Sequence, residues 1–138
     1  MRIEVEWHRR PQAGGGDVIM NNRWVVKPDV HRALEGGQRV IAFESTVLTH
    51  GLPYPDSTQL ALRVEEIARE EGCVPATIGV IDGVVHVGMT PDDIDRLAAD
   101  GHARKSSSFD LAFVIAQGAS AGTTVSGTLA IAERAGIR

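Results

Sequence analysis

The stretch that decides the fold is residues 40–55, VIAFESTVLTHGLPYP. It opens with apolar residues typical of a buried strand, reaches Glu44, and closes in a turn made rigid by Pro53 and Pro55. A carboxylate at the end of a buried strand is costly to desolvate unless it has partners or a chemical task. Because open α/β sheets build their sites at strand ends, the pattern predicts an α/β fold with Glu44 as a candidate catalytic residue.

The composition excludes several classes of protein. The 138 residues are 43% hydrophobic and 23% charged, which is typical of one globular domain. A net charge of −4 and an aromatic share of 4% argue against a nucleic-acid partner. No apolar run approaches the roughly 18 residues of a membrane span, and the single cysteine, Cys73, excludes an internal disulfide. We therefore predict a cytoplasmic protein that has neither a nucleic-acid nor a membrane partner.

Residues 1–22 form a separate segment. They show no hydrophobic period, and three consecutive glycines at positions 14–16 interrupt them. Two interpretations stay open: a disordered leader, or a non-native start upstream of a true start at Met20. In both cases residues 23–138 are expected to belong to one α/β domain.

The segments after residue 28 alternate between helical and strand patterns. Pro28 opens a predicted helix that ends at Gly36–Gly37, and residues 39–44 are the predicted strand. A longer helix is predicted over residues 57–71, capped by Asp56 or Ser57. Its predicted buried stripe consists of Leu60, Val64, Ile67 and Ala68. Its predicted solvated face consists of Glu65, Glu66, Arg69, Glu70 and Glu71.

The remaining segments predict a hairpin and further helices. Asp82–Gly83 lies between two β-rich runs within residues 76–88 and is a strong hairpin signal. Thr90 is the predicted cap of the next helix. A polar link over residues 102–108, a short helix within 109–116 packed under the sheet, and a small-residue loop over 118–128 follow. The helix opened by that loop is expected to bury Val125, Leu129, Ala132 and Ala135.

Three features are candidates for one site: Glu44, Lys105 and the loop that contains Thr123 and Thr124. The carboxylate is a candidate general acid or base, and Lys105 is a candidate point-charge partner for a phosphate. The backbone N–H groups of Thr124 and Val125 could hold a polar ligand. These residues alone slightly favour a structural alternative, with Glu44 in an ion pair, Lys105 in solvent and the loop in close packing.

Several familiar motifs are absent. The loop at residues 118–128 matches neither a Walker loop nor G-x-G-x-x-G, and Ser45 lacks the context of a G-x-S-x-G nucleophile. His86 has no second candidate ligand at metal-binding spacing, so it is expected to be a hydrogen-bonded or surface residue. The sequence therefore predicts no metal ligand within this chain.

Three segments carry a resemblance to a known family. They are AFESTVLTHGLPYP at residues 42–55, VPATIGVIDG at 74–83 and GTTVSGTL at 122–129, with KSSSFDLAFV at 105–114 between the last two. In sequence, order and spacing these segments resemble the pseudouridine-5′-phosphate glycosidase family. The resemblance extends from about residue 25 to the end of the chain. The resemblance implies the mixed α/β sheet, flanked by helices, of the indigoidine synthase A-like fold.

The resemblance also implies a reaction and roles for individual residues. The family cleaves the C–C glycosidic bond of pseudouridine 5′-phosphate reversibly to uracil and ribose 5-phosphate, using a lysine Schiff base and Mn²⁺. By position, Glu44 would be the proton donor and Lys105 would bind the substrate phosphate. Val125, with Thr124 beside it, would contact substrate. The motif residues Ser45, Thr46 and His50 would orient Glu44, although His50 could equally be structural.

The chain departs from the family pattern at its end. The family's metal-binding aspartate and Schiff-base lysine would lie beyond Arg138, and neither Lys27 nor Lys105 has the nucleophile's context. The chain therefore resembles an N-terminal half that is inactive alone, exposes sheet edges and apolar helix faces, and is homotrimeric when complete. A non-catalytic binding module for a phosphorylated nucleoside or sugar, and a different phosphosugar enzyme, remain alternatives.

Overall fold

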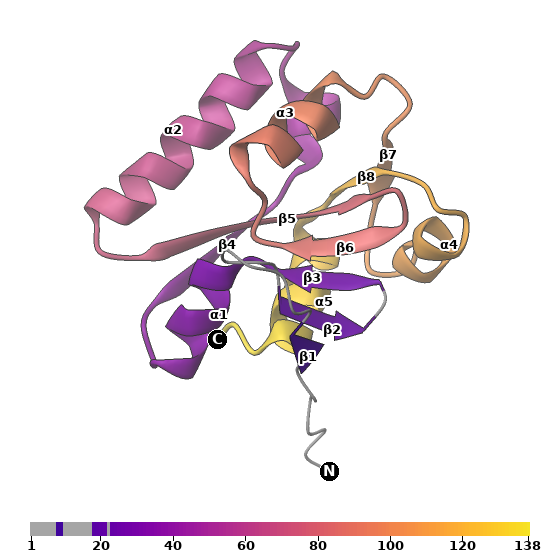
Figure 1. Ribbon diagram of the computed structural model, residues 1–138. Helices are drawn as coiled ribbons and strands as arrows, with labels where there is room; N and C mark the ends of the chain where they lie inside the picture. Colours follow the sequence, from indigo (N-terminus) through magenta and orange to yellow (C-terminus); the bar gives the residue numbers. More distant parts are fainter. Residues whose placement is uncertain (1–7, 10–17, 22) are drawn as a thin grey trace.

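The computed structural model describes residues 8–9, 18–21 and 23–138, and these residues form a mixed α/β sheet with helices on both faces (Figure 1). The strands are β1 (His8–Arg9), β2 (Val18–Asn21), β3 (Trp24–Val26), β4 (Val40–Phe43), β5 (Val74–Ile81), β6 (Val84–Val87), β7 (Arg104–Ser106) and β8 (Ala121–Thr123). The helices are α1 (Pro28–Glu35), the π-helical turn η1 (Val47–Gly51), α2 (Asp56–Glu70), α3 (Pro91–Ala99), α4 (Leu111–Ala116) and α5 (Val125–Ala135). The predicted fold class is therefore confirmed.

Strand β5 is the centre of the core, because its alternate residues point to opposite faces of the sheet. Ala76, Ile78 and Val80 belong to a buried cluster that also contains residues of α1 and α5. Ile81 belongs to a second cluster with Leu48 of η1 and with Ile94 and Leu97 of α3. In Figure 1, α1 and α5 lie on one side of the sheet and α2 and α3 lie on the other.

Two strands share one edge of β5 and run toward each other. Strand β4 is parallel to β5 and pairs Phe43 with Thr77, whereas β8 is antiparallel to β5 and pairs Gly122 with Gly79. The carboxyl ends of β4 and β8 therefore meet beside Ile78, which lies between the two ladders. This convergence brings the residues that follow β4 close to those that follow β8.

Two predictions that rest on local signals, the hairpin turn and the start of α3, are confirmed. The hairpin turns at Asp82 (φ 49°) and Gly83 (φ 73°), and its strands pair Ile81 with Val84. Both turn residues have positive φ, as the tight turn of a two-residue hairpin requires. Helix α3 begins with a capping box, in which the N–H of Asp93 donates to the Thr90 hydroxyl at 3.1 Å and the N–H of Thr90 donates to the Asp93 carboxylate at 3.0 Å.

The predicted orientation of α2 is partly wrong. Ala68 is buried as predicted, and the residues exposed as predicted are Glu66, Arg69, Glu70 and Glu71. Leu60 and Ile67 are 40% and 44% exposed, and Glu65, predicted to face solvent, is only 2% exposed. Glu65 is buried because it has two partners: it accepts hydrogen bonds from the Thr77 hydroxyl at 2.6 Å and from Arg69 at 2.7 Å. The predicted cap is also wrong, since Pro55 occupies the N-cap position and no side chain caps the helix.

Three segments predicted to be irregular or buried differ from the prediction. The polar link contains β7, the small-residue loop contains β8, and the turn after β4 contains η1.

In α5, Ala132 and Ala135 are buried as predicted, but Val125 and Leu129 are 65% and 63% exposed. The predicted apolar segment 109–116 and strand β4 also bury fewer residues than expected, because Phe109, Phe113 and Ile41 are exposed. Among the described strands, β4 pairs with β5 only, and its residues are half-buried or exposed.

The predicted leader is described only in part. Within residues 1–22 the structure describes β1 and β2, which pair with each other, and β2 pairs with β3. The glycines at 14–16, and the rest of the leader prediction, lie outside the described residues. In the described part of the chain, none of the helices has the length and apolar character needed to cross a membrane.

Candidate functional site

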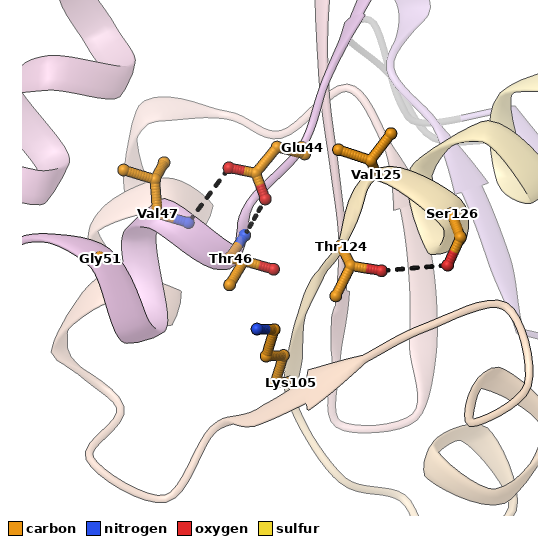
Figure 2. A pocket seen from close by; sticks show the side chains of 8 residues that line it. All are labelled: Glu44, Thr46, Val47, Gly51, Lys105, Thr124, Val125 and Ser126. Atoms are coloured by element: carbon orange, nitrogen blue, oxygen red, sulfur yellow. Dashed lines mark hydrogen bonds between the residues drawn. The ribbon is translucent and has the colours of Figure 1, made fainter.

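The ends of β4 and β8 open into a pocket of about 640 Å³ (Figure 2). The residues that line it come from three separate stretches of the chain. They are Glu44, Thr46, Val47, Gly51, Lys105, Thr124, Val125 and Ser126. The structure therefore brings together all four residues that the sequence analysis selected, although they lie up to 81 positions apart (44 to 125).

Glu44 follows β4 directly, and backbone amides hold its half-buried carboxylate at the start of η1. The N–H of Thr46 donates to Oε2 at 2.8 Å, and the N–H of Val47 donates to Oε1 at 3.3 Å (Figure 2). These donors are among the N–H groups that have no acceptor within the helical turn, so the carboxylate acts as a cap. The ion pair of the structural alternative is absent for Glu44 among the described residues.

Lys105 reaches the pocket because it lies in β7, opposite Gly122 of β8. The strand alternation buries Ser106 completely and leaves Lys105 exposed. Figure 2 shows the side chain extending from β7 toward the space between Thr46 and Thr124. Within the described part of the chain, the ammonium forms neither a hydrogen bond nor an ion pair, so its charge is available to an anionic ligand.

Thr124 and Val125 form the start of α5. Thr124 is the N-cap: its hydroxyl accepts from the N–H of Gly127 at 3.4 Å and lies 3.2 Å from the Ser126 hydroxyl. The N–H groups of Val125 and Ser126 have no acceptor within the helix, and the helix dipole makes them attractive to anions. The start of α5 and Lys105 therefore present positive potential to the same pocket.

Of the three residues expected to orient Glu44, one touches it. Thr46 does so through its backbone N–H. The Ser45 hydroxyl instead donates to the carbonyl of Ile78 at 2.6 Å. His50 is exposed, and its Nδ1 lies 2.7 Å from the hydroxyl of Thr49. His86 is half-buried, with Nδ1 3.9 Å from the carboxylate of Asp93.

The sequence analysis missed part of the pocket wall. Ser126 and Gly51 carried no distinguishing signal, whereas Thr46 was noted as a motif residue but given no ligand role. The Thr46 hydroxyl is buried and has no hydrogen-bond partner among residues 8–9, 18–21 and 23–138. An unpaired buried hydroxyl is costly, and because Thr46 lines the pocket, a polar ligand there is a candidate partner for this oxygen.

A smaller hollow of about 150 Å³ adjoins the pocket, and Glu44 and Val47 line both. Its other lining residues are Phe43, Leu60, Ala61, Val64 and Thr77.

Nowhere in the described ranges do three or more His, Cys, Asp or Glu side chains gather to hold a metal ion. The residues present therefore do not fit a complete Mn²⁺ site.

The fold and the pocket define a class: an α/β protein that gathers a carboxylate, an ammonium and a helix N-terminus around one open pocket at converging strand ends. Such a site fits a small anionic molecule. The chain belongs to the family described as indigoidine synthase A like protein, whose model matches residues 29–138.

Relatives with curated names agree with the resemblance stated above. The chain is 48% identical over 113 residues to the pseudouridine-5′-phosphate glycosidase of Dinoroseobacter shibae, and 45% identical over 114 residues to that of Escherichia coli K12. Each match covers 82% of this chain but only 37% and 36% of the respective relatives. The chain therefore spans less than two fifths of the length of these relatives.

Solved structures support the same fold. The crystal structure of the prealnumycin C-glycosynthase AlnA in complex with ribulose 5-phosphate has a TM-score of 0.75 and 36% identity, and covers 86% of this chain and 38% of that one. An indigoidine synthase A-like protein from Thermotoga maritima has a TM-score of 0.69 and 36% identity, covering 74% and 35%. The predicted indigoidine synthase A-like fold is thereby confirmed.

Proposed function

We propose that this chain forms the phosphosugar-binding and proton-donating part of a pseudouridine-5′-phosphate glycosidase. The reaction is the reversible cleavage of the C–C glycosidic bond of pseudouridine 5′-phosphate, which gives uracil and ribose 5-phosphate. The observation that carries the proposal is that Glu44, Lys105, Thr124 and Val125 line one pocket. The names of the relatives, and the phosphosugar in the related C-glycosynthase structure, support it.

The phosphate of the ligand belongs beside Lys105 and the start of α5. An ammonium without a partner in the described part of the chain is a point charge that a dianion can neutralise, and the first N–H groups of α5 can donate to its oxygens. The substrate contact proposed for Val125 is assigned to its backbone N–H, which lies in the first turn of α5 and has no acceptor within the helix. Thr124 shapes the same corner through its hydroxyl.

The sugar lies between that corner and Glu44, which we propose as the proton donor for opening and closing the ribose ring. Its carboxylate is held by two backbone amides, so its position is set before the ligand binds. Transfer of a proton to the ring oxygen lets that oxygen leave as a hydroxyl and exposes C1 as an electrophile. The unpaired Thr46 hydroxyl is placed to contact the sugar.

The remaining catalytic groups are proposed to come from outside the described residues. The proposed phosphate partner, Lys105, is the lysine that lines the pocket, while Lys27 pairs with Asp29 at 3.3 Å and does not line it. The nucleophilic lysine and the Mn²⁺ ligand of the family are therefore assigned to another part of the complete enzyme, and the described residues alone are expected to give no turnover. A cytoplasmic location and a homotrimer of the complete enzyme accompany the proposal.

Calorimetry with ribose 5-phosphate tests the binding part of the proposal. Lys105→Met should weaken binding by about ten- to hundredfold, the loss expected for a charge-assisted hydrogen bond. Lys27→Met is the matched control, because it removes the same charge away from the pocket. Absence of binding by the wild-type chain, or equal effects of the two substitutions, would contradict the proposal.

Borohydride reduction separates a phosphate-binding role of Lys105 from a nucleophilic one. If its amine attacked C1 of ring-opened ribose 5-phosphate, water would leave and an imine would form, and borohydride would reduce that imine to a stable secondary amine. We expect no such adduct on Lys105 by mass spectrometry of the treated chain. An adduct at this position would assign the nucleophile to Lys105 and refute the proposed role.

A chimera tests the catalytic part. Residues 29–138 replace the matching part of the Dinoroseobacter shibae relative, and uracil release from pseudouridine 5′-phosphate is measured with Mn²⁺. We expect activity that Glu44→Gln lowers by at least about a hundredfold, with ribose 5-phosphate binding retained. A folded chimera that binds but does not turn over would favour the alternative of a non-catalytic binding module, and release of a different product would favour another phosphosugar enzyme.

A further inference from the structure

We propose that Ser45 and Thr123 are positioning residues, which act together as a buried clamp between the two halves of the pocket. Ser45 follows Glu44 directly, and Thr123 precedes Thr124 directly. Neither residue lines the pocket, and both are fully buried. The clamp sets the position of the Glu44 carboxylate relative to the start of α5. The test of the clamp that measures ligand binding rests on the proposed function.

The two residues bind each other reciprocally. The N–H of Ser45 donates to the carbonyl of Thr123 at 3.1 Å, and the N–H of Thr123 donates to the hydroxyl oxygen of Ser45 at 2.9 Å. The first bond joins backbone to backbone, and the second requires a side-chain oxygen at position 45. Because β4 and β8 meet end to end rather than side by side, this pair replaces the ladder that would otherwise align them.

Both hydroxyls are anchored to one point on β5. The Ser45 hydroxyl donates to the carbonyl oxygen of Ile78 at 2.6 Å, and the Thr123 hydroxyl donates to the same oxygen at 2.8 Å. Since the Thr123 proton is used in that bond, the hydroxyl of Thr128 in α5 donates to Thr123 at 2.9 Å. Every member is at most 5% exposed, so the network is shielded from competing water.

Glycines bring the backbones close enough for the clamp to form. A Cβ on Gly122 would lie 2.6 Å from the carbonyl oxygen of Ser45 and would also collide with the Thr49 hydroxyl. A Cβ on Gly79, which pairs with Gly122, would lie 3.0 Å from the Ser45 hydroxyl. The backbone after β4 therefore rests directly on β8, and a shift of one displaces the other.

The clamp therefore separates the residues that bind the phosphate from Glu44, which must be aligned with the bound sugar. Phosphate requires Lys105 and the start of α5, which are joined through β7 and β8. A phosphosugar must in addition reach Glu44, which lies across the clamp. Loosening the clamp should therefore impair the recognition of ribose 5-phosphate more than that of inorganic phosphate.

The first test uses the chain without ligand and compares amide hydrogen exchange in variants. Ser45→Ala removes the acceptor for the Thr123 N–H, and Thr123→Val replaces a hydroxyl by a methyl group of similar volume. Thr58→Val is the matched control, because Thr58 is also buried and donates its hydroxyl to Asp95 at 3.3 Å, between α2 and α3.

The amides of Thr46 and Val47 report on the clamp, since both donate to Glu44. We expect their exchange, relative to that of the buried Ile131 in α5, to become about tenfold faster in both clamp variants and to stay unchanged in Thr58→Val. A uniform acceleration along the chain, or wild-type ratios in Ser45→Ala, would overturn the proposal. If Thr123→Val does not fold, Ser45→Ala decides, because it keeps the Thr123 hydroxyl bonds.

The second test measures the affinities for ribose 5-phosphate and inorganic phosphate by calorimetry. The clamp variants should weaken ribose 5-phosphate binding by about fivefold or more and phosphate binding by less than about twofold, and Thr123→Ser should restore the wild-type ratio. Equal losses for both ligands would overturn the clamp. If the wild-type chain binds neither ligand, the proposed function fails, and the exchange ratios still decide on the clamp independently.

Discussion

The hydroxyl of Thr77 donates a 2.6 Å hydrogen bond to the buried carboxylate of Glu65, and this bond joins α2 to the central strand β5. The same carboxylate accepts from Arg69, one helical turn later, at 2.7 Å. A charged side chain that is 2% exposed is tolerated only with such partners. The bond therefore holds the Glu65 side of α2 against the sheet.

Removing this carboxylate should destabilise the fold. Glu65→Ala leaves the buried Thr77 hydroxyl without its partner and opens a cavity, so we expect the free energy of unfolding to fall by about 2–4 kcal/mol in urea denaturation. Glu66→Ala is the control, because Glu66 is 61% exposed and its pair with Arg63 should contribute less than about 1 kcal/mol. Similar losses in the two variants would show that the Glu65 network does not hold α2.

The unpaired hydroxyl of Thr46 should contribute to ligand binding but little to the stability of the fold. Thr46→Val replaces a buried oxygen that lacks a partner in the described part of the chain, so we expect the unfolding free energy to change by less than about 1 kcal/mol. Ribose 5-phosphate binding, measured by calorimetry, should weaken by about tenfold, and Thr46→Ser should retain it. Unchanged affinity in Thr46→Val would exclude a ligand contact by this hydroxyl.

Two large apolar side chains are exposed on α2, and this exposure should promote self-association. Leu60 and Ile67 are exposed on α2, seven residues apart and therefore on the same face. We expect the double substitution Leu60→Glu and Ile67→Glu to lower association in sedimentation velocity, with the thermal midpoint nearly unchanged. Ile94→Glu is the contrasting variant, because Ile94 is fully buried and a charge there should prevent folding. Loss of the thermal midpoint in the double variant would mean that these residues stabilise the monomer.

The turn between β7 and α4 should be sensitive to acid. The pKa of Asp110 is lowered because the Ser107 hydroxyl, at 2.5 Å, and the Ser107 N–H, at 2.9 Å, donate to its carboxylate. A lowered folded-state pKa means that the stabilisation is present above the ordinary aspartate value of 3.8 and is lost as pH falls through the lowered value.

An NMR titration checks this prediction. The carboxyl carbon of Asp110 should titrate below the ordinary aspartate range, and the Ser107 amide resonance should move with the same midpoint. Ser107→Ala removes the hydroxyl that makes the larger contribution, so the pKa of Asp110 should rise toward its ordinary value. An unchanged midpoint in Ser107→Ala would contradict the assigned cause.

Local signals in the sequence determined the parts of the fold that neighbouring residues control. The Asp82–Gly83 turn and the Thr90 cap depend on backbone conformation and on bonds within three residues, so they could be predicted from composition and spacing. The sequence motif at residues 42–55 likewise identified the family and indicated Glu44 as a site residue. The four candidate site residues were found on this basis, although their catalytic and binding roles remain predictions.

Only the tertiary structure decided how these pieces meet. Periodicity predicted Glu65 in solvent and Ile67 in the core, because it could not include the partner that Thr77 supplies from another element. Nor could it reveal that β4 and β8 run toward each other along one edge of β5, since strand register is a relationship between distant segments. That convergence, held by Ser45 and Thr123 on the carbonyl of Ile78, places Glu44 and Thr124 at one pocket.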